Sequence, residues 1–311
     1  MSPRGTPMIL RSSLLFLSRR KALRRWMETS ALVRPLTARF IAGQTLEEAL
    51  DVCLRLERDG VMIMLDRLGE NVTSLDEAET SRDGYLHALR RLTDLGLAGC
   101  VSIKLTQFGM DLSEEACWKN ARRLAEEARS LGKTVEIDME SSDYVDRTLR
   151  LAVGLHESCG NVRAVIQAYL RRSGEDIERL CEKRVPVRLC KGAYREPVSV
   201  AFRRKSEVDR NYVRLMQILL ERGACPALAT HDERIIGEAQ RLAAAAGIGP
   251  QAFEFQMLYG IRRDLERRFV EQGYRLRLYV PYGQAWYPYF MRRLAERPAN
   301  LLFLARNLVR G

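Results

Sequence analysis

The stretch CVSIKLTQFGMDLSEEACWKNARRLAEEARSLGKTVEIDMESS, residues 100–142, contains two short apolar runs separated by a helical segment. Each run carries Val and Ile and ends in polar residues. The segment between them begins with acidic residues and then shows apolar residues at helical spacing. A strand, a helix and a strand in this order form a βαβ unit, in which the two strands pair in parallel.

The same alternation continues through the chain from about residue 44. Six further apolar runs follow the pattern, at residues 60–69, 162–170, 185–194, 225–232, 252–260 and 275–283. Eight strands alternating with helices predict a closed (β/α)8 barrel rather than an open sheet. No linker rich in Pro, Gly or Ser interrupts them. We therefore expect an α/β protein with one barrel domain over residues 44–311, preceded by a basic helical extension over residues 1–43.

Composition excludes several classes of protein. Hydrophobic residues make up 46% of the 311, which is adequate for a core, and no apolar run approaches the ~18 residues of a membrane span. The seven cysteines are odd in number and form no CxxC pair, so we expect reduced thiols in the cytoplasm. The three histidines lack ligand spacing, and we expect no metal.

The net charge of +11 is concentrated at the N-terminus. Residues 1–27 carry seven basic residues and no acid before Glu28. Such an arm suits anionic lipid or nucleic acid, and it also resembles a targeting peptide or an ordinary basic helix covering the domain. Because no recognisable nucleic-acid module accompanies it, we expect no nucleic acid partner. We expect a cytoplasmic protein with a peripheral contact on the inner face of the cell membrane.

Polar residues follow nearly every predicted strand. In barrels of this kind the active site lies at the C-terminal ends of the strands. The residues at those ends are Asp66, Lys104, Thr106, Gln107, Asp138, Glu140, Gln167, Arg188, Lys191, Thr230, His231, Gln256 and Tyr282. They predict a site at that end, whatever its chemistry.

Two motifs suggest what the site binds. In KGAY, residues 191–194, the small residues Gly192 and Ala193 let backbone approach a ligand, Lys191 offers charge and Tyr194 offers a flat ring. This suits a large anionic cofactor with a flat ring, although a tight turn is the plain structural alternative. Lys104 or Lys191 could also form a Schiff base, as in barrel aldolases and lyases.

The second motif is RLYVPYGQAWYPYFMRRLAERPAN, residues 277–300, in which aromatic residues precede Arg292 and Arg293. Adjacent helical residues point about 100° apart, so one solvated face does not easily use both arginines. Two guanidinium groups directed into one aromatic cavity would hold a small carboxylate. An amphipathic surface helix is the alternative.

These motifs resemble those of proline dehydrogenases, specifically the short bacterial monofunctional form. The resemblance runs from about residue 40 to the C-terminus. It rests on SIKLTQFG, IDME, QAYLRR, RLCKGAYREP, ATHD, FEFQMLYG and the C-terminal motif, in family order. It implies a distorted (β/α)8 TIM barrel with N-terminal helices and a last helix over the barrel mouth.

The resemblance also implies an activity. It predicts FAD-dependent oxidation of L-proline to Δ1-pyrroline-5-carboxylate, with a hydride passing from proline C5 to flavin N5 and electrons passing to a quinone. This reaction is the first step of proline catabolism. Because the chain has no aldehyde dehydrogenase half, a separate pyrroline-5-carboxylate dehydrogenase is expected to consume the product.

The matching positions assign roles. The catalytic residues implied are Asp138, Arg188 and Lys104. The substrate-binding residues implied are Lys104, Arg292 and Arg293 for the carboxylate, with Tyr279, Tyr289 and Leu258 around the ring. The cofactor-binding residues implied are Met139, Gln167, Arg188, Lys191, Gly192, Ala193, Tyr194, Thr230, His231 and Glu296. Glu296 could instead pair with the arginines.

Two positions depart from the family pattern. Cys190 stands where an aliphatic residue is expected, which is a small change. Asp232 stands where Asn is common, and its charge would alter the field near the cofactor phosphates.

Overall fold

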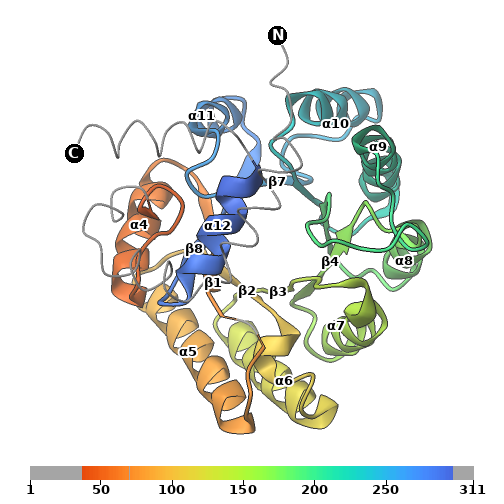
Figure 1. Cartoon of the computed structure of the whole chain (residues 1–311). Helices are drawn as coiled ribbons and strands as arrows, with labels where there is room; N and C mark the ends of the chain where they lie inside the picture. Colours follow the sequence, from red (N-terminus) through yellow and green to blue (C-terminus); the bar gives the residue numbers. More distant parts are fainter. Residues whose placement is uncertain (1–36, 70, 297–311) are drawn as a thin grey trace.

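A closed parallel barrel of eight strands forms the centre of the molecule, in the chain order β1 to β8 (Figure 1). The computed structural model describes residues 37–69 and 71–296. The strands are β1 Met62–Arg67, β2 Cys100–Ile103, β3 Val135–Ile137, β4 Val162–Gln167, β5 Val187–Cys190, β6 Ala227–Ala229, β7 Glu254–Leu258 and β8 Arg275–Tyr282. Each lies inside one of the eight predicted runs, so the barrel prediction is confirmed.

Most of the helices lie between successive strands and surround the barrel (Figure 1). They are α4 Leu46–Arg58, α5 Leu75–Asp94, α6 Glu114–Ser130, α7 Val145–Cys159, α8 Ser173–Glu182, α9 Lys205–Arg222, α10 Glu233–Ala245, α11 Arg263–Glu271 and α12 Trp286–Glu296, with 3₁₀ turns η1 Leu105–Phe108 and η2 Ser142–Tyr144. Short polar residues begin several of them, because a side-chain oxygen there accepts an unpaired backbone N–H. Thr45, Ser74, Ser113 and Asp232 do so for α4, α5, α6 and α10.

The two faces of the strands differ in polarity. In β3, Val135 and Ile137 belong to the main hydrophobic core, which also contains the buried helix residues. Glu136, between them, forms hydrogen bonds with Arg188 of β5 and Gln256 of β7. These strands are not neighbours of β3, so the contacts cross the inside of the barrel. The apolar core therefore lies between strands and helices, and polar groups fill the barrel.

Several strands are shorter than the predicted runs. In the run over 100–109 the strand β2 ends at Ile103, and η1 begins after one intervening residue, Lys104. All four residues of η1 are buried. The sequence stays apolar past the end of the strand because this turn is still inside the protein.

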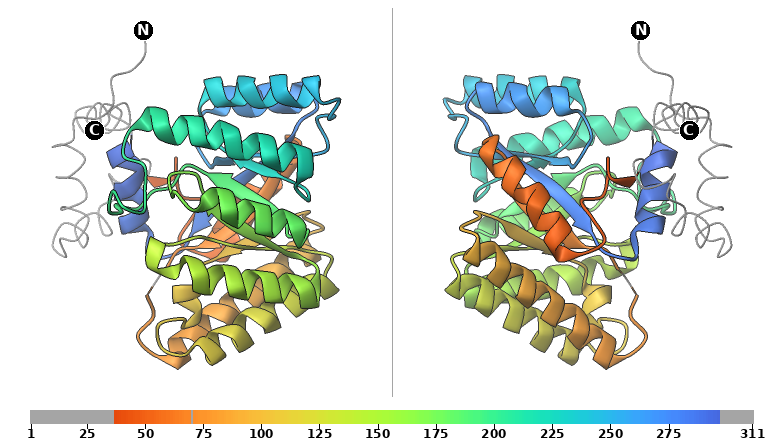
Figure 2. Two further views of the ribbon diagram at one scale, coloured as in Figure 1. Left: turned by 90° about the vertical axis from the view of Figure 1, so that its right-hand side faces the viewer. Right: turned by 90° about the vertical axis from the view of Figure 1, so that its left-hand side faces the viewer.

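The last helix covers one end of the barrel. α12 begins four residues after β8 ends, and Figure 2 shows it at one end of the barrel. Its aromatic residues pack on the segment before α4. The rings of Trp286 and Phe290 are 5.9 Å apart, and Phe40 lies 6.1 Å from Phe290. The C-terminal ends of the strands therefore lie beneath α12.

Part of the predicted N-terminal extension belongs to this end of the barrel. The backbone N–H of Ala42 donates to Pro281 O at 2.8 Å, and that of Gly283 donates to Gly43 O at 3.0 Å. Residues 1–36 of the extension lie outside the described residues. Among the helices that the structure does describe, none combines the length and apolarity needed to cross a bilayer.

Candidate active site

An ammonium group shared by two carboxylates lies at the C-terminal end of the barrel. Lys104 follows β2, and its Nζ is 3.2 Å from Oδ1 of Asp66, 3.3 Å from Oδ2 of Asp138 and 3.4 Å from the hydroxyl of Tyr279. Asp66, Lys104 and Asp138 lie at the C-terminal ends of β1, β2 and β3, and Tyr279 lies within β8. The parallel barrel thus brings three of the predicted strand-end residues together with Tyr279, which the family resemblance implied.

Asp138 is held by donors on both oxygens. Ser102 donates to Oδ1 at 2.7 Å, Tyr279 donates to Oδ2 at 2.9 Å, and the guanidinium of Arg188 contacts Oδ1. Burial alone would raise the pKa of Asp138, but the charges of Arg188 and Lys104 outweigh burial and lower the pKa to about 2. Asp138 is therefore a carboxylate at neutral pH.

The site continues into the barrel as a chain of ion pairs. Its members alternate in sign in the order Asp66, Lys104, Asp138, Arg188, Glu136, Arg163, Glu254 and Arg277. Arg163 Nη1 lies 2.6 Å from both Glu136 and Glu254. Four positive and four negative charges balance. Buried charges are tolerated when each has a partner, which accounts for so many inside one barrel.

Sequence reasoning did not predict the last four members of this series of ion pairs. Glu136, Arg163, Glu254 and Arg277 belong to strands but do not lie at their C-terminal ends. A charged residue at alternate positions of an otherwise apolar parallel strand was the available signal, because such strands are usually apolar on both faces. The prediction for Gln256 is corrected likewise. It lies inside β7 and donates to Glu136 at 2.8 Å, below the strand ends.

The charges around Lys104 disfavour a Schiff base. Burial would lower the pKa of this amine, but Asp66 and Asp138 outweigh burial and raise the pKa well above its ordinary value. A Schiff-base lysine needs a neutral amine, hence a lowered pKa. Lys104 is therefore a permanent cation at neutral pH.

Among the buried polar atoms that have no hydrogen-bond partner within the described part of the chain, two belong to residues predicted to bind the cofactor. They are Oε1 of Gln167 and Nε of Arg188. The amide of Gln167 is fixed, because Nε2 donates to the carbonyl of Met139 at 3.0 Å. The guanidinium of Arg188 lies 5.5 Å from the centre of the Tyr279 ring. An orphan acceptor and an orphan donor at the barrel mouth fit a ligand ring that has both kinds of hydrogen-bonding atom, such as a flavin.

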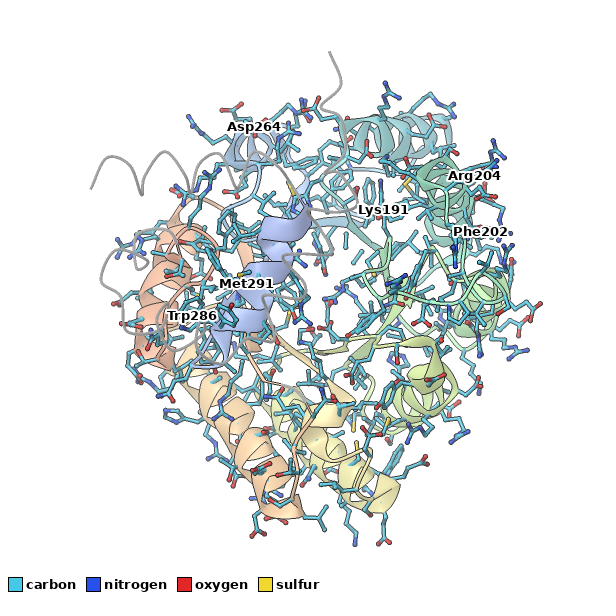
Figure 3. All side chains as sticks on the ribbon, in the orientation of Figure 1. Lys191, Phe202, Arg204, Asp264, Trp286 and Met291 are labelled. Carbon is cyan, nitrogen blue, oxygen red and sulfur yellow. The ribbon has the colours of Figure 1, made fainter. Side chains whose placement is uncertain are left out.

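Lys191 occupies a more exposed ion-pair cluster. Its Nζ is 2.6 Å from Asp209 and 2.9 Å from Asp232, and Lys205 contacts the same two carboxylates. Figure 3 shows Lys191 toward α9, on the other side of the barrel mouth from Met291 of α12. Two carboxylates thus neutralise the cation that the sequence assigns to the cofactor.

The turn after β5 needs glycine for a structural reason. Gly192 has φ +107°, and a Cβ there would lie 2.2 Å from the ring of Tyr169. Met139 packs in the same small hydrophobic cluster as Tyr169, and Tyr194 packs against it. Ala193 is exposed. The turn is therefore packed against the ring of Tyr169.

The residues after β6 are also fixed. Nε2 of His231 accepts a hydrogen bond of 3.0 Å from the backbone N–H of Leu258, which places the proton of the neutral ring on Nδ1. Thr230 is buried, and its hydroxyl accepts from the N–H of Asp232 at 3.1 Å. His231 and Leu258 are thus linked across β6 and β7.

α12 brings the predicted arginine pair to the barrel mouth. Arg292 and Arg293 are both half-buried, and the guanidinium of Arg293 lies 5.1 Å from the ring centre of Tyr289. Tyr289 belongs to the hydrophobic cluster beneath α12, against which Leu258 packs. The side chain of Glu296 lies outside the described residues. Across residues 37–69 and 71–296, no three His, Cys, Asp or Glu side chains form a group that could hold a metal.

Comparison with known proteins identifies the family. The family model described as "Proline dehydrogenase" matches residues 49–306. The chain is 42% identical over 282 residues to a Proline dehydrogenase of Deinococcus radiodurans, covering 89% of this chain and 91% of that protein. It is 38% identical over 302 residues to Proline dehydrogenase 1 of Bacillus subtilis (strain 168), covering 97% of this chain and 100% of that protein.

A solved structure shares the fold. Proline utilization A (PutA) from Bdellovibrio bacteriovorus, inactivated by N-propargylglycine, matches with a TM-score of 0.81 and 26% identity. The match covers 92% of this chain but only 36% of that longer chain. The sequence relatives and the shared barrel agree: the chain belongs to the proline dehydrogenase family of oxidoreductases.

Proposed function

We propose that the protein oxidises L-proline to Δ1-pyrroline-5-carboxylate with FAD as cofactor, and that the electrons pass to a quinone. Its family membership supports proline oxidation, the first step of proline catabolism. The observation that carries the proposal is the network of Lys104, Asp138, Arg188 and Tyr279 beneath α12. FAD, when bound, supplies the acceptor for the hydride that leaves proline C5.

Three cations hold the carboxylate of proline in this proposal. Lys104 lies at the end of β2, and Arg292 and Arg293 belong to the helix that covers the same end. Tyr279, Tyr289 and Leu258 enclose the ring. α12 shields the bound substrate from water, which strengthens the ion pairs and fixes C5 in one orientation.

Asp138 is suited to the charge that develops on the substrate. As hydride leaves C5, positive charge grows on the ring nitrogen. A carboxylate whose pKa is held at about 2 is ionised throughout, and it can stabilise this charge without taking up a proton. The surrounding cations favour loss of the ammonium proton before hydride transfer.

The cofactor-binding residues proposed are Met139, Gln167, Arg188, Lys191, Gly192, Ala193, Tyr194, Thr230, His231 and Glu296. Oε1 of Gln167 and Nε of Arg188 are buried atoms of these residues that have no hydrogen-bond partner within the described part of the chain, so we assign them to the flavin ring. Lys191 is assigned to the phosphates, because it is a cation beside a turn of small residues.

The proposal extends to the electron acceptor and to location. We place the protein in the cytoplasm, with a basic extension over residues 1–43 that makes a peripheral contact with the membrane containing the quinone. The seven cysteines, all free thiols, suit a reducing compartment. A separate pyrroline-5-carboxylate dehydrogenase would consume the product. Deleting residues 1–30 should weaken binding to phosphatidylglycerol vesicles while preserving oxidation of proline in solution.

The reaction is tested with purified protein, L-proline and a soluble redox dye. Mass spectrometry should detect a product two hydrogen atoms lighter than proline. The double variant Arg292→Ala/Arg293→Ala should raise KM for proline, because two of three carboxylate partners are lost. A matched control is Arg267→Ala on α11, which should leave KM unchanged. Absence of the lighter product would contradict the proposal.

A further inference from the structure

Asp66 is a second carboxylate beside Lys104, and its hydrogen bonding is incomplete. It lies in β1 and is 1% exposed. Its Oδ1 lies 3.2 Å from Lys104 Nζ and 3.4 Å from the hydroxyl of Tyr85. Oδ2 accepts no hydrogen bond from any residue that the structure describes. The hydroxyl of Tyr279 is also near Asp66, but it donates its one proton to Asp138.

The pKa values of the two carboxylates, Asp66 and Asp138, are shifted in opposite directions. Burial raises the pKa of Asp66, and the charge of Asp138 raises it further against the opposing charge of Lys104. The pKa of Asp138 is lowered because Arg188 also faces it. The titratable groups that face Asp66 come from four elements: Lys104 after β2, Asp138 after β3, Tyr279 and Tyr282 of β8, and Tyr85 of α5. Lys104 is the cation among them.

A bound carboxylate would be the third anion around this cation. Its negative charge would repel Asp66. Lys104 is the only cation among the described residues that face Asp66, so no second cation offsets this repulsion. Protonating Asp66 removes that repulsion. It also releases Lys104 from one of its two ion pairs, and the new proton would bind Oδ2, the oxygen without a partner.

We propose that Asp66 takes up a proton when the carboxylate of the substrate binds at Lys104, so that Asp66 sets the affinity of the site for carboxylates. This inference rests on the proposed function, which places that carboxylate at Lys104. The step is a proton transfer only: a proton from solvent forms an O–H bond on Asp66, and nothing is oxidised or reduced. Asp66 acts through Lys104 and is a positioning residue.

Proton uptake can be measured directly. The probe is tetrahydrofuran-2-carboxylate, in which oxygen replaces the ring nitrogen, so that no substrate ammonium contributes protons. Binding to the flavin-loaded full chain is measured by titration calorimetry in buffers of different ionisation enthalpy, from about pH 5 to about pH 9. We expect uptake to approach one proton per ligand as pH rises past the pKa of Asp66. The affinity should then fall by about tenfold per pH unit.

A variant assigns the proton to Asp66. Asp66→Asn imitates the protonated acid, so it should bind the probe with little dependence on pH and without proton uptake. With proline as substrate, its KM rather than its kcat should lose the corresponding pH dependence. The matched control is Asp111→Asn, a partly exposed carboxylate that pairs with Arg147 and should retain the wild-type profile.

The outcomes separate the two proposals. Binding without proton uptake would overturn the role of Asp66 and leave the proposed function intact. Uptake that persists in Asp66→Asn would overturn it as well. If that variant does not fold, the wild-type measurement still tests the proposal, because binding without proton uptake would overturn it. Failure of the probe to bind at all would contradict both proposals.

Discussion

The hydroxyl of Tyr279 in β8 donates to Oδ2 of Asp138 at 2.9 Å, and Asp138 follows β3, a strand that does not pair with β8. The hydrogen bond therefore crosses the mouth of the barrel. Lys104 approaches the same oxygen, while Ser102 and Arg188 approach the other. Four donors fix the carboxylate in one orientation and keep it ionised.

Removing this hydroxyl should weaken catalysis. Tyr279→Phe leaves the ring in place but removes one donor to a buried carboxylate, a loss of about 1.5–3 kcal/mol. We expect kcat/KM for proline to fall by roughly ten- to a hundredfold. The control is Tyr212→Phe, whose buried hydroxyl donates to the backbone of Leu189 at 3.0 Å. Equal losses in the two variants would show that the effect is structural rather than electrostatic.

Arg188 should be needed for stability as well as for activity. Arg188→Met leaves both Asp138 and Glu136 without one of their partners inside the barrel. Breaking a buried pair costs about 3–5 kcal/mol, which urea denaturation would detect. Arg241→Met removes an exposed partner of Glu238 and should leave the unfolding free energy nearly unchanged, because solvent screens exposed ion pairs. Similar costs would contradict the buried ion-pair chain.

The lowered pKa of Asp138 predicts a pH dependence of stability. Its pKa falls from 3.8 to about 2 on folding, so the unfolded state binds its proton first as pH falls. The resulting stabilisation, about 2 kcal/mol, is present above about pH 4 and is lost as pH falls toward about 2. The difference in unfolding free energy between wild type and Asp138→Asn should shrink over that interval. A difference that stays constant with pH would contradict the assignment.

Substitutions of Lys191 and of its partner Asp232 should change the affinity for FAD in opposite directions. Lys191→Met removes a cation and should weaken binding by about tenfold. Asp232→Asn removes one of two carboxylates that neutralise that cation, and it should tighten binding by about threefold. Flavin fluorescence during reconstitution of the apoprotein measures both. Lys183→Met, which breaks an exposed pair with Glu157, is the control. Weaker binding in Asp232→Asn would show that the aspartate supports the site.

The sequence predicted the barrel well because its strands alternate with helices over the whole length. It also predicted that Lys104 and Asp138 lie at one end, since the C-terminal ends of parallel strands share one edge. It did not predict the pairing between them. Which carboxylate meets which cation depends on strand register across the barrel, and no local pattern encodes that register.

The charged residues inside the barrel illustrate the same point. Glu136 and Arg163 occupy directly paired positions of β3 and β4, yet nothing in the sequence around either residue indicates that the two pair. Gly192 shows a second kind of feature that the sequence did not predict. Its motif suggested room for a ligand, whereas its conformation and the ring of Tyr169 already require glycine. Only tertiary contacts reveal these reasons.

The central claim is tested most directly by the visible spectrum of the purified protein before and after anaerobic L-proline. We predict flavin bands that bleach on addition of proline, which would establish the cofactor, the reaction type and the substrate together. A colourless protein that FAD cannot reconstitute, or flavin bands that proline leaves unchanged, would contradict the proposed function.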